Sequence, residues 1–135
     1  MPWGGVKRIL IFVLYAYWYR KLSAFSIKTG FQVGLHTCDW GLKFQHIGPI
    51  IINKQAKIGK NFRVYPQTLI GMAGVGNIPQ IGDNVHLCSG SRVIGKVKIG
   101  NNVVIAPNSL IIKDVPDNAV MVSTPASILK YRTEV

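Results

Sequence analysis

The sequence predicts an all-β fold, a left-handed parallel β-helix of hexapeptide repeats, with a short helix at its N-terminus. An aliphatic residue recurs every six positions through most of the chain, and a small or β-branched residue follows it four positions later. The length of 135 residues gives room for one domain. Neither a helix nor an ordinary alternating strand has a period of six, whereas a coil with three short strands per turn has one.

The first element is a helical segment that we place at residues 1–30. An apolar run at residues 9–19 lies between the basic pairs Lys7-Arg8 and Arg20-Lys21. A membrane span needs about 20 apolar residues, so the run is too short, and no small-residue cleavage site follows it. Its aromatic residues and flanking cations suit a helix at a membrane surface, and a helix packed on protein explains them equally well. Peripheral membrane contact is therefore one of two open predictions.

The second element is a β-helix domain that we place at residues 31–135. Each hexad should form one strand and one corner, with glycine or asparagine after the aliphatic position supplying the corners. A β-sandwich is disfavoured, because its turns recur every 8 to 12 residues. The inner residues should be Ile52, Ile58, Val64, Ile70, Ile81, Leu87, Val93, Ile99, Ile105 and Ile111 at the aliphatic position, and Ala56, Thr68, Val85, Ser91, Val97, Val103, Ser109 and Val115 at the second position.

Two segments break the period. Residues 71–80 lengthen one step from six to eleven residues, so a loop should project from the coil there. Such loops often hold binding or catalytic groups, and an insertion without a function is the alternative. Residues 114–130 interrupt the hexads with two prolines and should form a cap over the C-terminal end.

The composition limits the possible partners. Lys and Arg number 16 against 5 Asp and Glu, and the net charge of +11 favours anionic partners. No nucleic-acid partner is expected, because the aromatic residues cluster near the N-terminus instead of alternating with the cations. Cys38 and Cys88 form no metal or redox motif, and we interpret both as buried thiols in a reducing compartment.

A resemblance to a known family rests on three stretches: FQHIGPIIINKQAKIG from Phe44, PQIGDNV from Pro79, and KDVPDN from Lys113 followed by Thr124-Pro-Ala126. Over residues 34–130 the sequence resembles the hexapeptide-repeat acyltransferase superfamily. Within it the sequence is similar to the serine acetyltransferase-like branch, which includes polysaccharide O-acetyltransferases. The resemblance implies a cytoplasmic, homotrimeric enzyme that moves an acetyl group from acetyl-CoA to a hydroxyl group and requires no metal.

The same resemblance implies a catalytic residue. In the family a histidine twelve residues before an Ala-x-Ile-Gly hexad acts as the general base, and His46 has this spacing from Ile58. An alcohol is a weak nucleophile near neutral pH, and a positioned imidazole can take its proton as it attacks a thioester. The alternative is a structural histidine that faces the interior, because His46 is in phase with Ile52. We interpret His36 and His86 as surface or packing residues.

The acyl donor should lie, by this resemblance, with its pantetheine arm extended in a groove between the coils of two subunits. Small residues there would let the arm approach the backbone, and cations near the C-terminal end would bind the phosphates. The matching residues are Gly71, Met72, Ser89, Gly90, Ala106 and Pro107 for the arm, and Lys113, Lys130 and Arg132 for the phosphates.

The acceptor depends on two departures from the family pattern. Enzymes that act on serine carry an Asp before the catalytic histidine and a second histidine before the Pro-Lys-Ile-Gly hexad, where this sequence has Gln45 and Ile78. A serine ammonium group needs an anion, so we predict a sugar hydroxyl of a surface-polysaccharide precursor, with serine as the alternative. A backbone carbonyl or Asp39 could orient His46 instead of the missing Asp.

Two other function classes remain as alternatives. A non-catalytic β-helix that serves as a membrane scaffold would bind no acetyl-CoA. A β-helical zinc enzyme would need three converging histidines, and the three in this sequence lack the spacing of that family.

Overall fold

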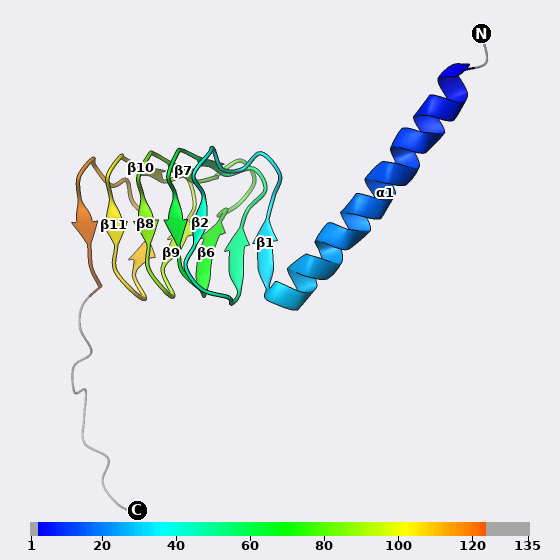
Figure 1. Cartoon of the computed structure of the whole chain (residues 1–135). Coiled ribbons are helices and arrows are strands. Elements are labelled where there is room, and N and C mark those ends of the chain that lie inside the picture. The colour runs from blue at the N-terminus through cyan, green and yellow to red at the C-terminus, as the bar shows by residue number, and fades with distance from the viewer. Residues whose placement is uncertain (1–2, 124–135) are drawn as a thin grey trace, which may run out of the picture.

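The computed structural model describes residues 3–123, and the side chains from Lys7 onward. In this part of the chain one helix, α1 (Trp3–Thr29), is followed by a solenoid of short parallel strands, β1 to β13 (Figure 1). The chain passes through the three faces of the solenoid in turn and completes five coils. The predicted fold, a left-handed parallel β-helix with an N-terminal helix, is therefore confirmed.

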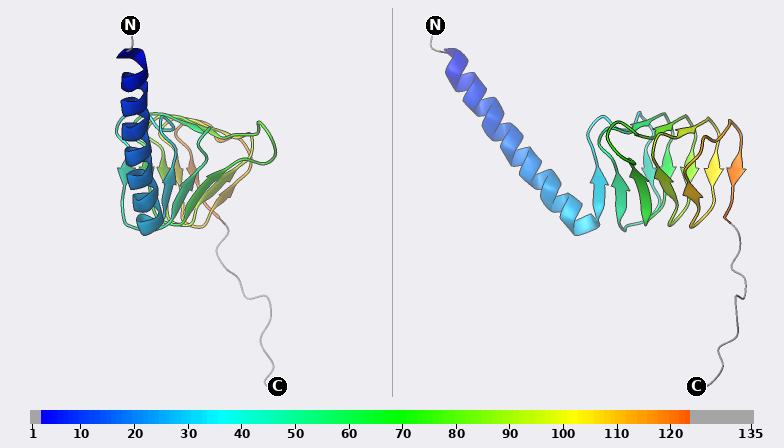
Figure 2. Two further views of the ribbon diagram at one scale, coloured as in Figure 1. Left: turned by 90° about the vertical axis from the view of Figure 1, so that its right-hand side faces the viewer. Right: turned by 180° about the vertical axis from the view of Figure 1, so that it is seen from behind.

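Helix α1 is longer than the predicted apolar run, since it continues from residue 19 to Thr29. It ends where Gly30 takes a φ of +75° and its N–H donates to the Ser26 carbonyl at 2.8 Å, a left-handed cap that glycine adopts without a steric penalty. The helix points away from the solenoid and meets it only at this end (Figures 1 and 2). No helix within residues 3–123 has both the length and the apolar character needed to cross a membrane.

The strands form three parallel sheets, one on each face of the solenoid. Sheet A contains β1 (Phe31–Val33), β3 (Ile50–Ile52), β6 (Thr68–Gly71), β9 (Arg92–Ile94) and β12 (Leu110–Ile111). Sheet B contains β4 (Lys57–Ile58), β7 (Gln80–Ile81) and β10 (Lys98–Ile99), and isolated bridges join Cys38 to Ile58 and Ile99 to Val115. Sheet C contains β2 (Lys43–Phe44), β5 (Arg63–Val64), β8 (His86–Leu87), β11 (Val104–Ile105) and β13 (Val120–Met121).

Three edges separate the sheets. The A–B edge contains residues 34–37, 53–56, 72–79, 95–97 and 112–114. The B–C edge contains residues 39–42, 59–62, 82–85, 100–103 and 116–119, and the C–A edge contains residues 45–49, 65–67, 88–91 and 106–109.

The core is the stack of side chains inside the coil. All of the predicted inner residues, at both positions of the hexad, are at most 5% exposed. Equivalent residues lie in register from coil to coil, as Ile52 does over Ile70 and Ile70 over Val93. The six-residue period therefore predicted the inner column correctly.

The first coil departs from the period by two residues. Phe44 and not His46 faces the interior, because Phe44 pairs in register with Val64 and stacks on Phe31 with 4.6 Å between ring centroids. Five residues, 45–49, connect β2 to β3, whereas three residues, 65–67, make the same connection one coil later. His46 lies in the longer connection and is exposed. The interpretation of His46 as an inward structural histidine is therefore wrong.

On the B–C edge, glycine and asparagine contribute to the tight corner in different ways, although we predicted that either residue could form it. Gly59 does not have a positive φ, but a Cβ there would lie 2.8 Å from the Gly82 carbonyl of the next coil, so glycine allows the close approach. Asparagines supply the left-handed turn, with φ between 54° and 61°, and join successive coils through side-chain hydrogen bonds of 3.0 to 3.1 Å: Asn61, Asn84, Asn102 and Asn118.

Residues 72–79 leave the coil between β6 and β7 and stand out from the A–B edge (Figure 2). The Ala73 N–H donates to the Asn77 carbonyl at 3.3 Å, and the Asn77 amide donates to the Ala73 carbonyl at 2.8 Å. Val75 between them is fully exposed. That this loop holds functional groups stays a prediction.

The predicted C-terminal cap is only partly described. Val115 bridges to Ile99, and β13 pairs with β11, so residues 114–121 form the fifth coil instead of interrupting the solenoid. The remainder of the cap prediction falls on residues 124–130, which lie outside the described residues. The division into a helical segment of residues 1–30 and a β-helix domain of residues 31–135 stays a prediction.

Candidate active site

His46 lies on the C–A edge of the first coil, where its side chain is exposed. The residue before it, Gln45, is fixed by a hydrogen bond from its N–H to the Val64 carbonyl at 3.1 Å. Residues 65, 88 and 106 donate their N–H groups to the next coil in the same way. In this register, the residues equivalent to His46 in the following coils are Pro66, Ser89 and Pro107.

The C–A edge also holds four of the residues predicted to bind acetyl-CoA. Ser89, Gly90 and Ala106 are half-buried and Pro107 is exposed. Gly90 has a φ of +72°, and a Cβ there would lie 2.1 Å from the Asn108 side-chain oxygen, so only glycine fits between the coils. Adjacent strands are about 4.8 Å apart, which places Ser89 about 10 Å from His46 along the solenoid axis. Residues 88–91 and 106–109 of this edge therefore carry small side chains, and the pantetheine arm predicted to lie there stays a prediction.

The other predicted acetyl-CoA residues lie on or beside the A–B edge. Gly71 is the last residue of β6, Met72 follows it and is 46% exposed, and Lys113 is exposed in the fifth coil. Sheet A separates these residues from the C–A edge. One copy of the chain therefore does not bring the predicted residues together. Lys130 and Arg132 lie outside the described residues.

The outer face of sheet A, between these two edges, carries mostly apolar side chains around one exposed cation, Arg92, which pairs in register with Leu69 and Leu110. Ile51, Leu110 and Ile112 are 40%, 57% and 61% exposed. Leu69 and Ile94 are half-buried between them. By contrast, the outward positions of sheet B are Lys57, Gln80 and Lys98. Predicted site residues thus lie on both edges of this face, with His46 and Ser89 on the C–A edge and Met72 and Lys113 on the A–B edge.

The nearest aromatic neighbour of His46 is Tyr65 of the next coil, with 6.0 Å between ring centroids and planes tilted by 57°. Within residues 3–123 neither Asp39 nor a backbone carbonyl forms a hydrogen bond with the imidazole. Asp39 lies on the B–C edge, where its carboxylate accepts the Trp40 N–H at 2.7 Å. The prediction that Asp39 could orient His46 is therefore wrong for a single copy, because the two residues occupy different edges.

The positions that differ from the serine-specific pattern are both half-buried. Gln45 follows β2, and Ile78 packs against the core at the end of the projecting loop. Neither side chain carries a charge. The described chain therefore offers no carboxylate in the position from which the family orients its histidine.

The three histidines lie apart in the solenoid. His36 is exposed on the A–B edge with a φ of +59°, and His86 is on the outer face of sheet C. Burial lowers the pKa of His86, and the neighbouring Arg63 cation lowers it further. In the described part of the chain no three His, Cys, Asp or Glu side chains lie close enough together to hold a metal ion.

Both cysteines are free and half-buried, so they are less enclosed than predicted. Burial raises the pKa of the Cys38 thiol to about 11. The thiol therefore stays protonated near neutral pH, and Cys38 is unsuited to act as a nucleophile.

Three comparisons with known proteins agree with this geometry. Residues 78–113 match the family model described as "Bacterial transferase hexapeptide (six repeats)". The chain is 31% identical over 114 residues to a serine acetyltransferase of Staphylococcus aureus strain Mu50, and the match covers 82% of this chain and 51% of that protein. A serine acetyltransferase of Staphylococcus epidermidis gives the same identity and coverage. The chain thus spans about half the length of the curated relatives that it matches.

Solved structures give the same family. A serine acetyltransferase isoform 3 of Entamoeba histolytica, solved in complex with cysteine, superimposes with a TM-score of 0.67 at 28% identity, covering 78% of this chain and 40% of that one. A soybean serine acetyltransferase apoenzyme superimposes with a TM-score of 0.59 at 27% identity, covering 67% of this chain and 40% of that one. In both cases the similarity covers most of the present chain and less than half of the larger enzyme.

Proposed function

Because the chain belongs to the hexapeptide-repeat acyltransferase superfamily and is serine acetyltransferase-like, we propose that it transfers an acetyl group from acetyl-CoA to a hydroxyl oxygen. The observation that carries the proposal is the position of His46. The histidine with the family's spacing is exposed on the C–A edge, which also carries Ser89 and Gly90, and it is not part of the core.

In the proposed reaction, His46 accepts one proton and later returns it. Its imidazole accepts the proton of the acceptor hydroxyl while the oxygen forms a bond to the thioester carbon. The bond from that carbon to sulfur then breaks, and His46 returns the proton to the departing thiolate. An acetyl ester and free coenzyme A are the products, so protons and electrons balance without another reactant.

We propose that further copies of the chain complete the site, in a homotrimer. The apolar outer face of sheet A, with Leu110 57% exposed, supports packing against another copy. Such packing can bring the C–A edge of one copy, with His46, next to the A–B edge of another, with Met72 and Lys113. The residues that one chain keeps apart would then line one groove, in which Lys113 is suited to hold a phosphate.

Serine is the acceptor that the relatives favour, and we propose it as the first to be tested. The comparisons do not support the predicted polysaccharide acceptor, and they fit the alternative of a serine O-acetyltransferase better. Gln45 and Ile78 remain the observations that set this chain apart from the serine-specific pattern. The use of acetyl-CoA and the two free cysteines favour the cytoplasm as the compartment.

Release of coenzyme A from acetyl-CoA, measured with a thiol reagent and with serine or a panel of free sugars as acceptor, tests the function. We expect His46→Asn to lower kcat by about 100-fold or more, because the general base is lost. His36→Asn is the matched control: it also replaces an exposed histidine, and asparagine tolerates the positive φ of residue 36. This variant should keep its activity.

The outcomes separate the claims. Equal activity of wild type and His46→Asn would remove His46 from the mechanism. Turnover with a sugar and none with serine would keep the acetyltransferase and reject serine. A folded chain that releases no coenzyme A with any acceptor would contradict the proposed activity.

A further inference from the structure

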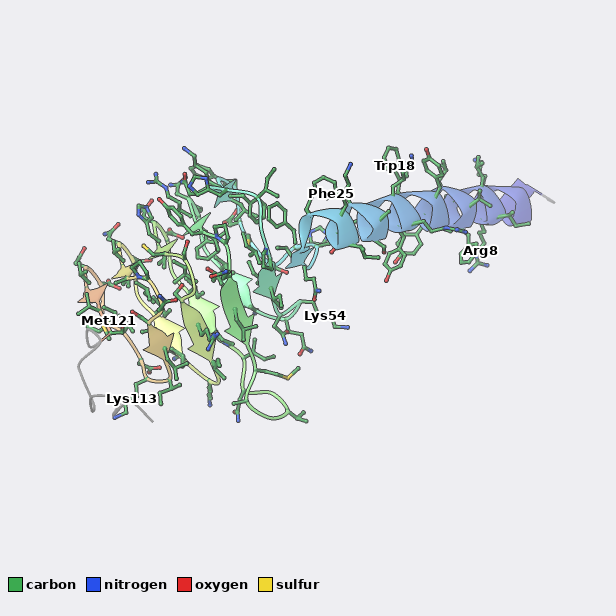
Figure 3. All side chains as sticks on the ribbon, turned by 90° about the horizontal axis from the view of Figure 1, so that it is seen from below. Arg8, Trp18, Phe25, Lys54, Lys113 and Met121 are labelled. Atoms are coloured by element: carbon green, nitrogen blue, oxygen red, sulfur yellow. The ribbon has the colours of Figure 1, made fainter. Side chains whose placement is uncertain are left out.

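Helix α1 exposes apolar side chains on all sides. Figure 3 shows Trp18 and Arg8 on opposite sides of the helix, with the solenoid beyond its C-terminal end. Successive residues of a helix are about 100° apart, so an unbroken apolar run surrounds the axis. The residues of this run are between 50% and 69% exposed: Ile9, Leu10, Ile11, Phe12, Val13, Leu14, Tyr15, Tyr17, Trp18 and Tyr19. The described solenoid leaves all of them at least half exposed, with Tyr15 and Tyr19 bordering the hollow between α1 and β1.

Cations lie at both ends of this run. Lys7 and Arg8 precede it, Arg20 and Lys21 follow it, and α1 contains no Asp or Glu. Eleven helical residues extend about 16 Å, roughly half of the 30 Å hydrocarbon thickness of a bilayer. The apolar run is therefore too short for a complete crossing, and both of its basic ends reach headgroups only if the helix lies along the membrane surface. Its two basic ends are suited to anionic headgroups.

We propose that α1 anchors the chain in one leaflet of a bilayer that contains anionic lipids. The helix is immersed at the level of the headgroups and the first acyl carbons, where Tyr and Trp side chains are most stable. The basic pairs reach from there to the lipid phosphates through their long side chains. This anchoring does not depend on acetyl transfer.

The distribution of apolar residues favours lipid over the helices of other copies. A helix bundle in water covers one stripe of each helix and leaves the opposite face polar. Between residues 9 and 19 α1 has no polar face, so a bundle would leave part of the apolar surface in water. Lipid can contact the whole circumference, and the net charge of +11 attracts an anionic surface.

The position of the anchor has a consequence for the site. Only Gly30 separates α1 from β1, the first strand of the first coil, and this coil carries His46. Insertion of α1 would therefore bring the first coil, and not the fifth, closest to the lipid headgroups.

The test uses the full chain with Trp3→Phe and Trp40→Phe, so that Trp18 is the remaining tryptophan. Vesicles of phosphatidylcholine with phosphatidylglycerol should shift its emission to the blue, and acyl-brominated lipids should quench it. Vesicles of phosphatidylcholine alone should have a much smaller effect. Emission that is already blue-shifted without lipid, and that vesicles leave unchanged, would overturn the proposal in favour of a helix covered by other copies.

A pair of charge variants tests which cations of the chain bind the anionic vesicles. Arg20→Gln with Lys21→Gln should weaken sedimentation with the anionic vesicles by roughly 30-fold, because each cation at the surface contributes about a fivefold gain. Lys57→Gln with Lys98→Gln removes the same charge from the outer face of sheet B and should leave binding nearly unchanged. An equal loss in both variants would overturn the assignment to α1 and indicate attraction by the whole basic surface.

Discussion

Helix α1 and the solenoid carry similar aliphatic residues and differ in what covers them. Leu87 in the third coil is fully buried, whereas Leu14 in α1 is 50% exposed. The solenoid stacks each coil on the next and so encloses its own apolar side chains. The helix leaves the first coil and has no partner within the described residues (Figure 2).

This difference shows that apolar content alone does not make a core. The solenoid has a period, and the period decides which side chains meet inside. The apolar run at residues 9–19 has no such period, so a partner other than the solenoid must cover its side chains. Variants that separate enclosed from uncovered apolar residues test this difference directly.

The largest expected effect is on the stability of the solenoid. Leu87→Ala should lower the free energy of unfolding by about 2 to 5 kcal/mol, because it leaves a cavity in the inner column. Leu14→Ala makes the same change on α1 and should alter it by no more than about 0.5 kcal/mol. Urea unfolding followed by circular dichroism measures both. Similar losses in the two variants would mean that α1 is covered by protein in solution.

A smaller effect is expected at the polar positions of the inner column. The Thr68 hydroxyl donates to the Tyr65 carbonyl at 2.7 Å, so Thr68→Val should cost about 1 kcal/mol of unfolding free energy. Ser91 Oγ is buried and has no hydrogen-bond partner among the described residues. Ser91→Ala should therefore be neutral or stabilising in the same assay. A loss at Ser91 as large as that at Thr68 would show that its hydroxyl is bonded.

The smallest expected effect is on the pH dependence of the stability of the solenoid. Burial and Arg63 hold the pKa of His86 in the folded chain below its usual value. Between these two pKa values the unfolded chain binds more protons, so solenoid stability is complete above about pH 6.5 and falls as the pH drops below it. His86→Gln should reduce this dependence in thermal unfolding measured from pH 5 to 8. An unchanged slope would contradict the role of His86.

The inner column was predictable because burial follows directly from the six-residue beat. The inward position of Phe44 was not predictable. The connection 45–49 has two extra residues, and the hexads after it have the same pattern with or without them. Met121 was missed for a similar reason, because the fifth coil is shorter in sequence than the others. A pattern of spacing locates residues within a coil and fails where a corner changes length.

The candidate site was predictable as a set of residues and not as an arrangement. The resemblance to the family, through its spacing of a histidine from the Ala-x-Ile-Gly hexad, identified His46, while the contact with Tyr65 depends on the register between coils. The same register places Ser89 on one edge and Met72 near another. The sequence pattern does not show that Ser89 and Met72 lie on different edges, because the edges form only when the chain folds into the coil.

Calorimetric titration of acetyl-CoA into the full chain tests the proposed acetyl transfer without any knowledge of the acceptor. We expect saturable binding with one site per chain and a Kd below about 1 mM. A folded chain that binds no acetyl-CoA at that concentration would contradict the proposed activity and favour a non-catalytic β-helix.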